Sequence, residues 1–448
     1  MKLYPDHVYA PTPAPSYWQA TTPDAVPGPA LAEDLMVDTA VIGGGYTGLN
    51  AALRLAQRGV DVAVFDTGHP GWGASGRNGG FVCVGGSAHG YDHLIAKHGQ
   101  AETQNFVNHQ RAAIEHVAAL LEAHAINADR HSDGEWALAH SRSAFEGAAR
   151  KLATERALGF DVRAFSQEEL NERGMGGPTF HGGHQLACGF AIHPLKYATG
   201  LARATQAAGA QVFSHSKVTR ISSENGYRLT VNGHTVQARR VIIGANGYAQ
   251  EGLIPWLNGR FLPVVSSIMV TEEISEADQR AQGWWSDQAA YDSRALVHYF
   301  RMLPEGRMMF GARGGSSLSK RGDRYLETMI RREFETMFPG WRHIATSHRW
   351  TGLLSLARDR SLYTGPIPDM PGAFTSFAYH GNGVAMGSYC GKLLADMALG
   401  DLAPGDLPLP MRAPARKFPA AALRMAYIKA VYAWWDVKEA LGGTGPKG

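Results

Sequence analysis

The sequence has few cysteines, and their spacing excludes two common classes of protein. Cys83, Cys188 and Cys390 are the only three, and they lie far apart along 448 residues. They form no Cys-x-x-Cys pair, so they predict neither a disulfide framework nor a cysteine metal centre. The histidines, among them His109 and His116, show no metal-ligand spacing either. Unpaired thiols suit a reducing compartment, so the expected location is the cytoplasm.

The sequence also lacks long apolar runs and dense basic clusters. No stretch approaches the roughly 20 apolar residues that a membrane-spanning helix needs. The net charge is only +3, without a dense run of lysine and arginine, so nucleic acid is not expected as the main partner. Residues 1–35 are rich in proline and have no signal-peptide apolar core. We expect them to form an extended arm on the surface.

Length and composition indicate two domains. A chain of 448 residues exceeds one ordinary domain, and hydrophobic residues make up 44% of it, enough for a sizeable core. Segments that resemble a nucleotide-binding sheet alternate with segments that do not. The two domains are therefore expected to be interleaved along the chain.

The most informative stretch covers residues 36–80. An apolar run is followed by three glycines, a helix-like segment and a second apolar run that ends in Asp66. In such a pattern Gly43 permits a tight turn, Gly45 lets the backbone approach a pyrophosphate, and Gly48 lets the helix pack against the sheet. The acid is placed to bind a ribose. The pattern favours a dinucleotide at the helix N-terminus over a glycine-rich turn without a ligand.

A second glycine-rich run, from Gly71 to Gly80, follows directly. It reads GWGASGRNGG, with a serine and an arginine among the glycines. Its backbone can follow an extended ligand with N–H and hydroxyl donors facing it. A plain NAD-binding domain would continue with ordinary helix and strand units instead. A flexible surface loop is the alternative for this run taken alone.

Taken together, Gly43-Gly44-Gly45-Tyr46-Thr47-Gly48-Leu49 and Gly73-Ala74-Ser75-Gly76-Arg77-Asn78-Gly79-Gly80 resemble the FAD-dependent D-amino-acid oxidase superfamily. Within it the chain looks most like the gamma-glutamylputrescine oxidoreductases, over nearly its whole length. The resemblance implies an α/β fold, in which a Rossmann-like FAD-binding domain of the glutathione-reductase type is interleaved with an α+β substrate domain built on an antiparallel sheet. The implied FAD contacts are Gly43, Gly45, Tyr46, Thr47, Gly48, Asp66, Ser75, Gly76, Arg77, Asn78, Gly79, Gly80, Val218, Ala245, Gly247, Gly381, Asn382, Gly383 and Val384.

The remaining pattern divides the chain between these two domains. Periodicity predicts helices over residues 100–125, 145–158, 168–173, 194–208, 323–338 and 384–399. It predicts strands over residues 211–213, 217–221, 261–272, 296–303, 307–312 and 374–379. Residues 36–87, 190–252 and 346–402 are assigned to the FAD-binding domain, and residues 88–189 and 253–345 to the substrate domain. Residues 403–448 are a helical tail, expected to pack on its own protein rather than on a membrane.

A second glycine turn, His380-Gly381-Asn382-Gly383, precedes the last of these helices. If this helix N-terminus points at the pyrimidine edge of the flavin, its dipole stabilises the negative charge that develops there on reduction. An ordinary capped helix is the alternative that the residues alone leave open. The resemblance favours the flavin role.

Two departures from related enzymes narrow the chemistry that the resemblance implies. Sarcosine oxidases place a carboxylate-binding lysine where this chain has Ala385, which favours a longer amine over a small α-amino acid. Sarcosine oxidases also tether their flavin through a cysteine, and residues 349–359 contain none. Non-covalent FAD is therefore expected.

The leading hypothesis is an FAD-dependent amine oxidase that acts on gamma-glutamylputrescine or a related omega-amino compound in polyamine catabolism. By resemblance, a hydride passes from the carbon beside the amine to flavin N5, and O2 then reoxidises the flavin with formation of H2O2. One alternative is an N-methyl- or D-amino-acid oxidase or dehydrogenase. Others are a membrane-peripheral dehydrogenase that passes electrons to a quinone and a flavin-binding protein without turnover. The oligomeric state is left open.

Candidates for contact with the substrate are His298, Arg301, Trp350 and His380. Residues 296–303 are expected to form a strand that covers the flavin. Alternation along it puts His298 and Phe300 on one face and Tyr299 and Arg301 on the other. Which face meets the flavin is left open, and a structural role is the alternative for each of these residues.

Overall fold

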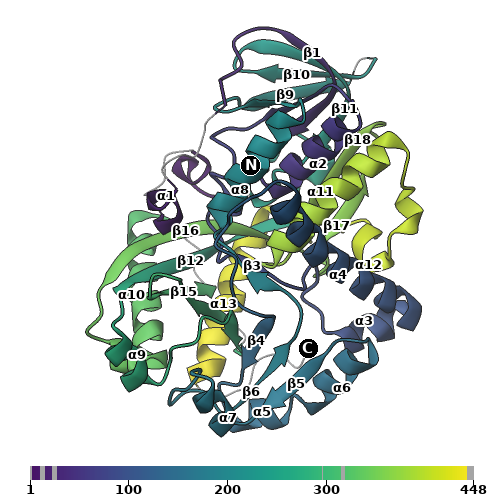
Figure 1. Ribbon diagram of the computed structural model, residues 1–448. Coiled ribbons are helices and arrows are strands. Elements are labelled where there is room, and N and C mark those ends of the chain that lie inside the picture. Colours follow the sequence, from purple (N-terminus) through teal and green to yellow (C-terminus); the bar gives the residue numbers. More distant parts are fainter. Residues whose placement is uncertain are drawn as a thin grey trace.

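The computed structural model describes residues 3–10, 16–22, 28–223, 225–294, 296–313 and 318–440. Two eight-stranded sheets organise the chain. One lies in the upper part of Figure 1 and the other in the lower part. Parts of the predicted N-terminal arm and the last residues of the predicted tail lie outside the described residues. The described part of the arm corrects the prediction of an extended surface segment, because Tyr17–Ala20 form a short helix, α1, in which Trp18 is buried.

The first sheet has a parallel core. Its strands are β1 (Leu35–Ile42), β2 (Val62–Phe65), β8 (Gln211–Phe213), β9 (Val218–Ser223), β10 (Tyr227–Val231), β11 (His234–Ile243), β17 (Tyr363–Pro366) and β18 (Ala373–Phe377). The main order is β17-β18-β11-β1-β2-β8, and β9 and β10 continue from β11 as an antiparallel meander. Strand β1 pairs in parallel with both β2 and β11. It is buried on both faces, which explains its nearly continuous apolar run.

Helices cover one face of this sheet and the meander covers the other. The helices are α2 (Tyr46–Gln57), α8 (Pro194–Ala207) and α11 (Gly383–Leu399). Val41 of β1 packs with Leu55 of α2 and Leu394 of α11. Its neighbour Ile42 points the other way and packs in the cluster that contains Leu229 of the meander. Because side chains alternate along β1, the strand packs against the helices on one side and the meander on the other. Each buried aliphatic side chain contributes about 1.5–3 kcal/mol to the stability of the fold.

The second sheet is antiparallel except at one junction. Its strands are β4 (Glu135–Leu138), β5 (Val162–Phe165), β6 (Gly183–Leu186), β12 (Phe261–Glu273), β13 (Ala290–Asp292), β14 (His298–Met302), β15 (Arg307–Arg313) and β16 (Thr346–Ala357). Their order is β16-β12-β15-β14-β13-β4-β6-β5, and only β13 and β4 pair in parallel. Strands from two distant parts of the chain therefore form one surface.

An aromatic cluster covers the outer face of this sheet. Helix α10 (Lys320–Met337) and the turn after it bring Phe334, Phe338 and Trp341 against Phe300 and Phe310 of the sheet. Ring centroids of Phe300 and Phe338 lie 5.4 Å apart in an edge-to-face arrangement. The face of β14 that carries Phe300 is therefore covered by α10. The opposite face is turned toward the first sheet.

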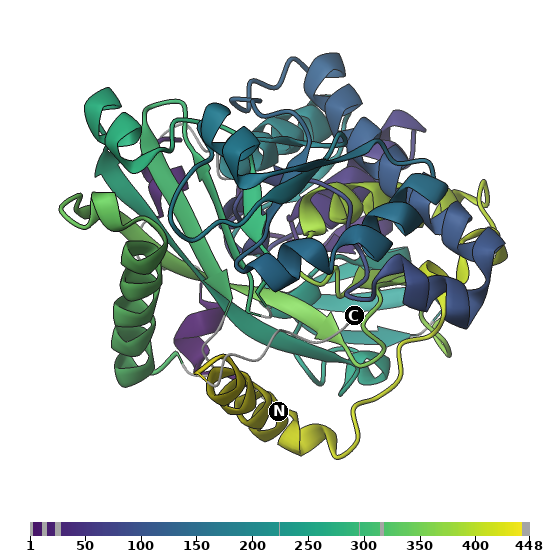
Figure 2. The same cartoon turned by 90° about the horizontal axis from the view of Figure 1, so that it is seen from below.

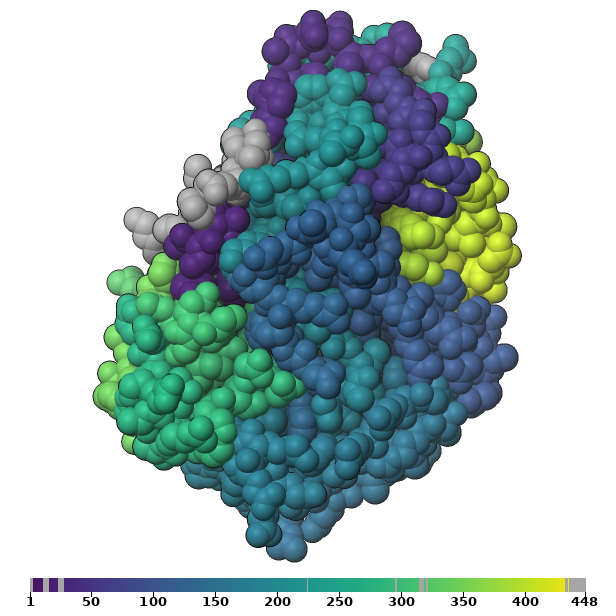
Figure 3. Space-filling model, viewed as in Figure 1, coloured from purple at the N-terminus to yellow at the C-terminus, as the bar shows by residue number. Residues whose placement is uncertain are grey.

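The remaining helices surround the two sheets. They are α1 (Tyr17–Ala20), α3 (Tyr91–His98), α4 (Gln100–Ala123), α5 (Arg142–Glu146), α6 (Ala149–Ala157), α7 (Gln167–Glu172), α9 (Glu276–Gln282), α12 (Leu409–Arg412) and α13 (Arg424–Ala440). Helix α4 contacts α11 and α12, and Figure 3 shows these blue and yellow segments side by side. Helix α13 lies below the second sheet in Figure 2, where Ile428 packs on Leu262 and Val264 of β12. Within the described part of the chain, no helix is long and apolar enough to cross a membrane.

The predicted fold class is confirmed, with three local differences. Strand β16, which the sequence analysis placed in the FAD-binding domain, pairs with β12 and belongs to the second sheet. The helix predicted over residues 145–158 is two helices, α5 and α6, that are separated by two residues at Gly147. The short strands β4, β5, β6, β13 and β17 were not predicted, although the equally short strand over residues 211–213 was. Runs of three or four residues carry little periodicity of their own.

Candidate functional site

The first glycine turn joins β1 to α2 at the edge of a cavity. Gly43 has a φ of +106°, which favours glycine at this position. A Cβ on Gly48 would lie 1.9 Å from the Gly43 carbonyl oxygen, so only glycine allows the helix to begin this close to the strand. Helix α2 has no side-chain cap, and the Tyr46 N–H donates to Ser75 Oγ at 3.0 Å. The helix N-terminus is left open to the cavity and to the second glycine run.

The second glycine turn leads into α11 and reaches the same cavity. His380 and Gly381 have φ values of +55° and +99°. The Asn382 side chain does not cap the helix, because its Nδ2 donates to the Val84 carbonyl oxygen at 2.9 Å. Helices α2 and α11 pack against each other. Two uncapped N-termini, each with a partial positive charge, therefore meet at one site.

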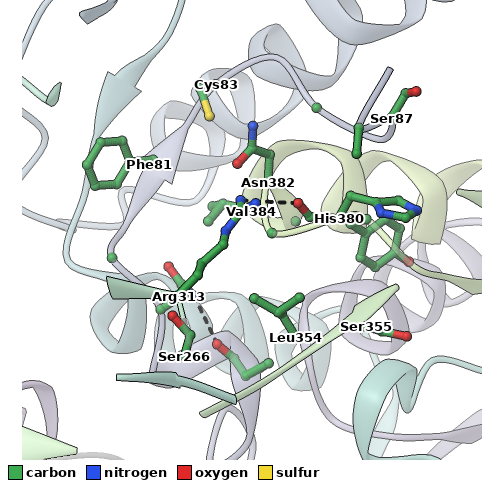
Figure 4. Close-up of a pocket in the computed structure, with 18 of the residues that line it drawn as sticks. Phe81, Cys83, Ser87, Ser266, Arg313, Leu354, Ser355, His380, Asn382 and Val384 are labelled. Atoms are coloured by element: carbon green, nitrogen blue, oxygen red, sulfur yellow. Dashed lines mark hydrogen bonds between the residues drawn. The ribbon is translucent and has the colours of Figure 1, made fainter. Parts of the chain in front are cut away.

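The cavity between the two sheets has a volume of about 1370 Å³. Small-molecule sites usually measure roughly 300–1,000 Å³, so this one has room for a dinucleotide and a further ligand. Part of its wall is drawn in Figure 4. The predicted site residues that line it are Gly43, Gly45, Tyr46, Thr47, Asp66, Ser75, Arg77, Asn78, Gly79, Val218, Ala245, His380, Gly381, Asn382, Gly383 and Val384.

Four glycines predicted as FAD contacts do not line the cavity; these are Gly48, Gly76, Gly80 and Gly247. They allow close packing instead. A Cβ on Gly76 would lie 2.2 Å from the Gly71 carbonyl oxygen, and one on Gly80 would lie 1.9 Å from the Ile192 carbonyl oxygen. The structure thus gives these positions a packing role behind the wall.

Asp66 closes the first glycine turn. Its carboxylate accepts from the Gly44 N–H at 2.5 Å, from the Gly68 N–H at 2.8 Å and from the Trp72 indole. Burial raises the pKa of Asp66, while these hydrogen bonds act against the rise. Asp66 lines the cavity, so its contact with a ribose stays a prediction.

Arg77 presents a buried cation to the cavity. Its Nε donates to the Thr351 carbonyl oxygen at 2.8 Å, whereas its Nη1 is buried without a hydrogen-bond partner among the described residues. Burial lowers the pKa of Arg77, since the charge is removed from water. A buried cation with an unpaired donor is costly unless an anion is bound beside it. The glycine turns and Arg77 therefore fit an anionic dinucleotide such as FAD.

Three side chains hold the second glycine run from behind, through three consecutive carbonyl groups. Trp350 Nε1 donates to the Arg77 oxygen at 2.9 Å, and Trp18 Nε1 donates to the Asn78 oxygen at 2.9 Å. Arg301 Nε donates to the Gly79 oxygen at 3.0 Å. Each of the three side chains is at least 98% buried.

Arg301 and Trp350 were predicted to contact the substrate, but neither lines the cavity. The other guanidinium nitrogens of Arg301 bind the Ile192 carbonyl oxygen and His131 Nε2, each at 2.7 Å. Burial lowers the pKa of Arg301 to about 9. The structure gives both residues a supporting position behind the glycine run in place of the predicted contact.

The two predicted histidines differ in position. His298 does not line the cavity; its Nδ1 is 2.7 Å from Asp292 Oδ2, and its ring stacks on Phe310. His380 does line the cavity, but its Nε2 accepts from the Ala357 N–H at 3.4 Å. Burial lowers the pKa of His380 to about 3, so the ring is neutral and a weak base.

Ser266 and Arg313, on the β12–β15 side of the cavity, were not predicted to belong to the site, whereas Tyr299 of β14 lies on one of the two faces that the sequence left open. Tyr299 OH lies 2.9 Å from Ser266 Oγ, and both residues line the cavity. Arg313 extends from the end of β15, and its Nη2 donates to the His380 carbonyl oxygen at 3.3 Å, drawn dashed in Figure 4. Alternation along β14 places Tyr299 and His298 on opposite faces of the strand. Because Tyr299 lines the cavity and His298 does not, the face that carries Tyr299 is the one that meets the cavity.

The cavity continues away from the glycine turns into what we call the distal lobe, lined by Tyr91, Glu135, Lys151, Glu155 and Tyr291. Burial raises the pKa of Glu135 to about 7. Lys151 Nζ lies 3.6 Å from Glu155 Oε1 and 3.2 Å from His184 Nε2. No sequence motif marks these residues, which come from α3, β4, α6 and β13. Among the described residues there is no group of three or more potential ligands that could hold a metal ion.

Comparison with known proteins gives consistent results. A family model described as "FAD dependent oxidoreductase" matches residues 38–397. The chain is 30% identical to a probable oxidoreductase OrdL of Rhizobium meliloti (strain 1021) over 432 residues, which cover 96% of this chain and 98% of that protein. It is 27% identical to the gamma-glutamylputrescine oxidoreductase of Escherichia coli (strain K12) over 434 residues, which cover 95% of this chain and 98% of that protein.

A solved structure shows the same fold. Glycine oxidase from Geobacillus kaustophilus superimposes with a TM-score of 0.69 at 20% identity. The match covers 86% of this chain and 100% of that chain. The β1–α2 glycine turn and the second sheet therefore belong to a known arrangement.

The first prediction concerns Arg77. Replacing it in an Arg77→Met variant removes the buried cation and leaves the Trp350 bond to the Arg77 backbone intact. We expect FAD to bind about 10- to 100-fold more weakly, the effect of one charged hydrogen bond. The melting temperature of the FAD-free protein is expected to be unchanged or higher, because a desolvated charge is gone.

Fluorescence titration of FAD-free protein with FAD measures the first effect, and thermal unfolding measures the second. Arg142→Met is the matched control, since the Arg142 side chain is 86% exposed and lies outside the cavity. An unchanged FAD affinity in Arg77→Met would show that the Arg77 charge does not face the cofactor.

The second prediction concerns Glu135. Its pKa in the folded protein, about 7, lies above its ordinary value of 4.5. The stability that Glu135 contributes is therefore fully present below pH 4.5, its ordinary pKa, and is lost as the pH rises through its pKa of about 7 in the folded protein. In a Glu135→Gln variant this loss is absent. Between pH 5 and pH 8 the unfolding free energy of the wild type is expected to fall by on the order of 2 to 3 kcal/mol relative to the variant.

Urea unfolding of both FAD-loaded proteins at pH 5, 6, 7 and 8 measures this difference. Parallel pH profiles of the two proteins would contradict the raised pKa. The Glu135→Gln variant is expected to fold, because a neutral amide resembles the protonated carboxyl group in size and charge.

Proposed function

The chain belongs to the family of FAD-dependent oxidoreductases, and on this basis we propose that it oxidises a C–N bond of an extended amine, with gamma-glutamylputrescine or a related omega-amino compound as substrate. One observation carries this proposal. The cavity does not end at the glycine turns but continues across the second sheet to the distal lobe. A small amino acid would leave most of that length unfilled. The similarity to the gamma-glutamylputrescine oxidoreductase of E. coli also supports this proposal.

The residues of the chain have three tasks in this reaction. Bound FAD supplies the acceptor for the two electrons of the C–N bond. Arg77 and the N-termini of α2 and α11 bind the anionic parts of the cofactor and fix its position. Tyr299 and Phe81, whose rings meet edge to face at 5.8 Å, form a wall that excludes water and positions the substrate. This water exclusion lowers the pKa of the substrate amine and favours its neutral, reactive form.

The reaction needs no strong base from the protein. His380 lines the cavity, but burial lowers its pKa to about 3, so it is a poor proton acceptor at neutral pH. A desolvated ammonium loses its proton to solvent as it enters the cavity. O2 is the proposed final electron acceptor. Polyamine breakdown in the cytoplasm is the proposed setting.

The third prediction is that FAD is bound non-covalently. Cys83 is the cysteine that lines the cavity, and burial raises its pKa well above the ordinary value. A thiol kept protonated is a poor nucleophile toward a flavin. We expect the yellow colour to separate from the chain after acid precipitation, as read from the absorbance of the supernatant. Flavin that stays with the precipitated chain would contradict this.

Arg313 favours a second candidate function. Its guanidinium lies at the start of α11, close to Tyr299 and Ser266, where a substrate carboxylate beside the reacting C–N bond would bind. Ala385 removes the lysine that sarcosine oxidases use, and Arg313 supplies a positive charge from another direction. An N-methyl- or D-amino-acid oxidase or dehydrogenase is therefore the alternative that this residue supports.

The fourth prediction separates these two candidates. The visible spectrum of the FAD-loaded protein is recorded under nitrogen, before and after addition of gamma-glutamylputrescine. Prompt loss of the flavin absorbance is expected, because the amine reduces the cofactor when no acceptor is present. Admission of air should then restore the absorbance with formation of H2O2.

Dithionite serves as the positive control, because it reduces the flavin without the active site. Unchanged absorbance with gamma-glutamylputrescine but loss with D-amino acids or N-methyl amino acids would replace the first candidate by the second. Slow recovery in air but fast recovery with a quinone would identify a dehydrogenase. A flavin that no amine reduces would leave a binding protein without turnover.

A further inference from the structure

The distal lobe carries more acid than its own cations neutralise. Glu135 begins β4, and Glu155 lies on α6; both are at least 93% buried and line the cavity. Lys151 is the basic residue next to them, and it is 3.6 Å from Glu155 Oε1. The two arginines near the lobe already have partners, since Arg150 pairs with Asp92 and Arg294 pairs with Asp292. Arg156 adds a further positive charge near Glu155, although its Nε binds the Val162 carbonyl oxygen. Among the described residues Glu135 forms no ion pair, and its hydrogen-bond partner is the Cys83 thiol.

Glu155 gives an independent sign of a missing ligand. Its Oε2 is buried and has no hydrogen-bond partner among the described residues, although Oε1 faces Lys151. A buried carboxylate oxygen without a donor is costly, so such atoms usually face a bound group. The residue lines the cavity, and the missing donor is therefore expected to come from a ligand.

Aromatic side chains complete the lobe. The pKa of Tyr91 and the pKa of Tyr291 are raised by burial and, in addition, by the nearby Glu135 and Glu155. All four side chains belong to residues that line the distal lobe. The Tyr91 OH donates to Gln110 Oε1 at 2.8 Å, so it does not supply the missing donor to Glu155. Carboxylates beside the rings of tyrosine are the surroundings in which proteins bind ammonium groups.

We propose that the distal lobe binds a second positively charged group of the substrate, an ammonium held between the carboxylates of Glu135 and Glu155. This inference rests on the proposed amine oxidation and narrows its substrate class. Preferred substrates are extended amines with an ammonium group at the end remote from the oxidised C–N bond. The glutamyl end of gamma-glutamylputrescine has such an ammonium, together with a carboxylate that suits Lys151.

Charge supports an ammonium over a neutral end group. Without a ligand, burial holds Glu135 close to half protonated at neutral pH. An ammonium that binds beside it stabilises the ionised form, and the proton is released. His184 has its pKa lowered to about 3 by burial, so it stays neutral and its ring accepts from Lys151 instead of competing for the carboxylates.

The fifth prediction is a binding preference. Unbranched α,ω-diaminoalkanes of four to ten carbons are compared with monoamines of equal length. Each is titrated into the FAD-loaded protein under nitrogen and followed by calorimetry. For at least one length, we expect the diamine to bind at least about 10-fold more tightly than the monoamine, as one charged hydrogen bond predicts. In Glu135→Gln and in Glu155→Gln this preference should fall below about 3-fold.

Glu146→Gln is the matched control, because it removes a negative charge from the neighbouring helix at a side chain that is 64% exposed. It should keep the wild-type preference. The inference is overturned if the wild type prefers the diamine at no length, or if the Glu135→Gln/Glu155→Gln double variant keeps the full preference. The flavin absorbance of the same samples reports separately on amine oxidation. A preference without any bleaching would keep the distal ammonium site and reject the oxidase.

Discussion

The site depends on three hydrogen bonds to consecutive backbone oxygens. Trp350, Trp18 and Arg301 come from three distant segments and bind the carbonyl oxygens of residues 77, 78 and 79. Each bond satisfies a buried N–H donor whose loss would cost about 1–3 kcal/mol, so the donors and the glycine run hold each other in place. The same bonds turn the carbonyl oxygens of this run away from the cavity. Residues 77, 78 and 79 themselves all line the cavity.

The cavity is electrically polar along its length. The glycine turns contribute two helix N-termini and the unpaired Nη1 of Arg77, all of them positive. The distal lobe contributes Glu135 and Glu155, with Lys151 as the adjacent base. Under the proposed function, the anionic dinucleotide and the ammonium end of the substrate are therefore expected to bind to different residues of the cavity wall. Arg313 also lines the cavity and donates to the His380 carbonyl oxygen, and it is the group proposed to bind a substrate carboxylate.

Features that depend on consecutive residues, such as the glycine turns, could be predicted from the sequence. Features that depend on contacts between distant residues could not. The turns at Gly43 and Gly381 were predicted because local backbone geometry requires glycine there, with φ values of +106° and +99°. Along β14, alternation correctly separated Tyr299 from His298 but did not say which face is open. Aromatic packing from α10, which follows in the chain, decides that. Arg301 shares the open face with Tyr299, yet it lies beyond the edge of the cavity, beneath residue 79.

The same reasoning explains why the cofactor is easier to infer than the substrate. Most of the predicted cofactor residues cluster in two short runs whose local patterns are visible in the sequence. A family model matches residues 38–397 of a chain that is 30% identical to a known relative. The distal lobe is built from α3, β4, α6 and β13, which carry none of those motifs. Strands β4 and β13 become neighbours only when two distant segments join one sheet. If the proposed function holds, a substitution at Glu135 is therefore expected to change the substrate preference while leaving the two glycine runs that hold FAD unchanged.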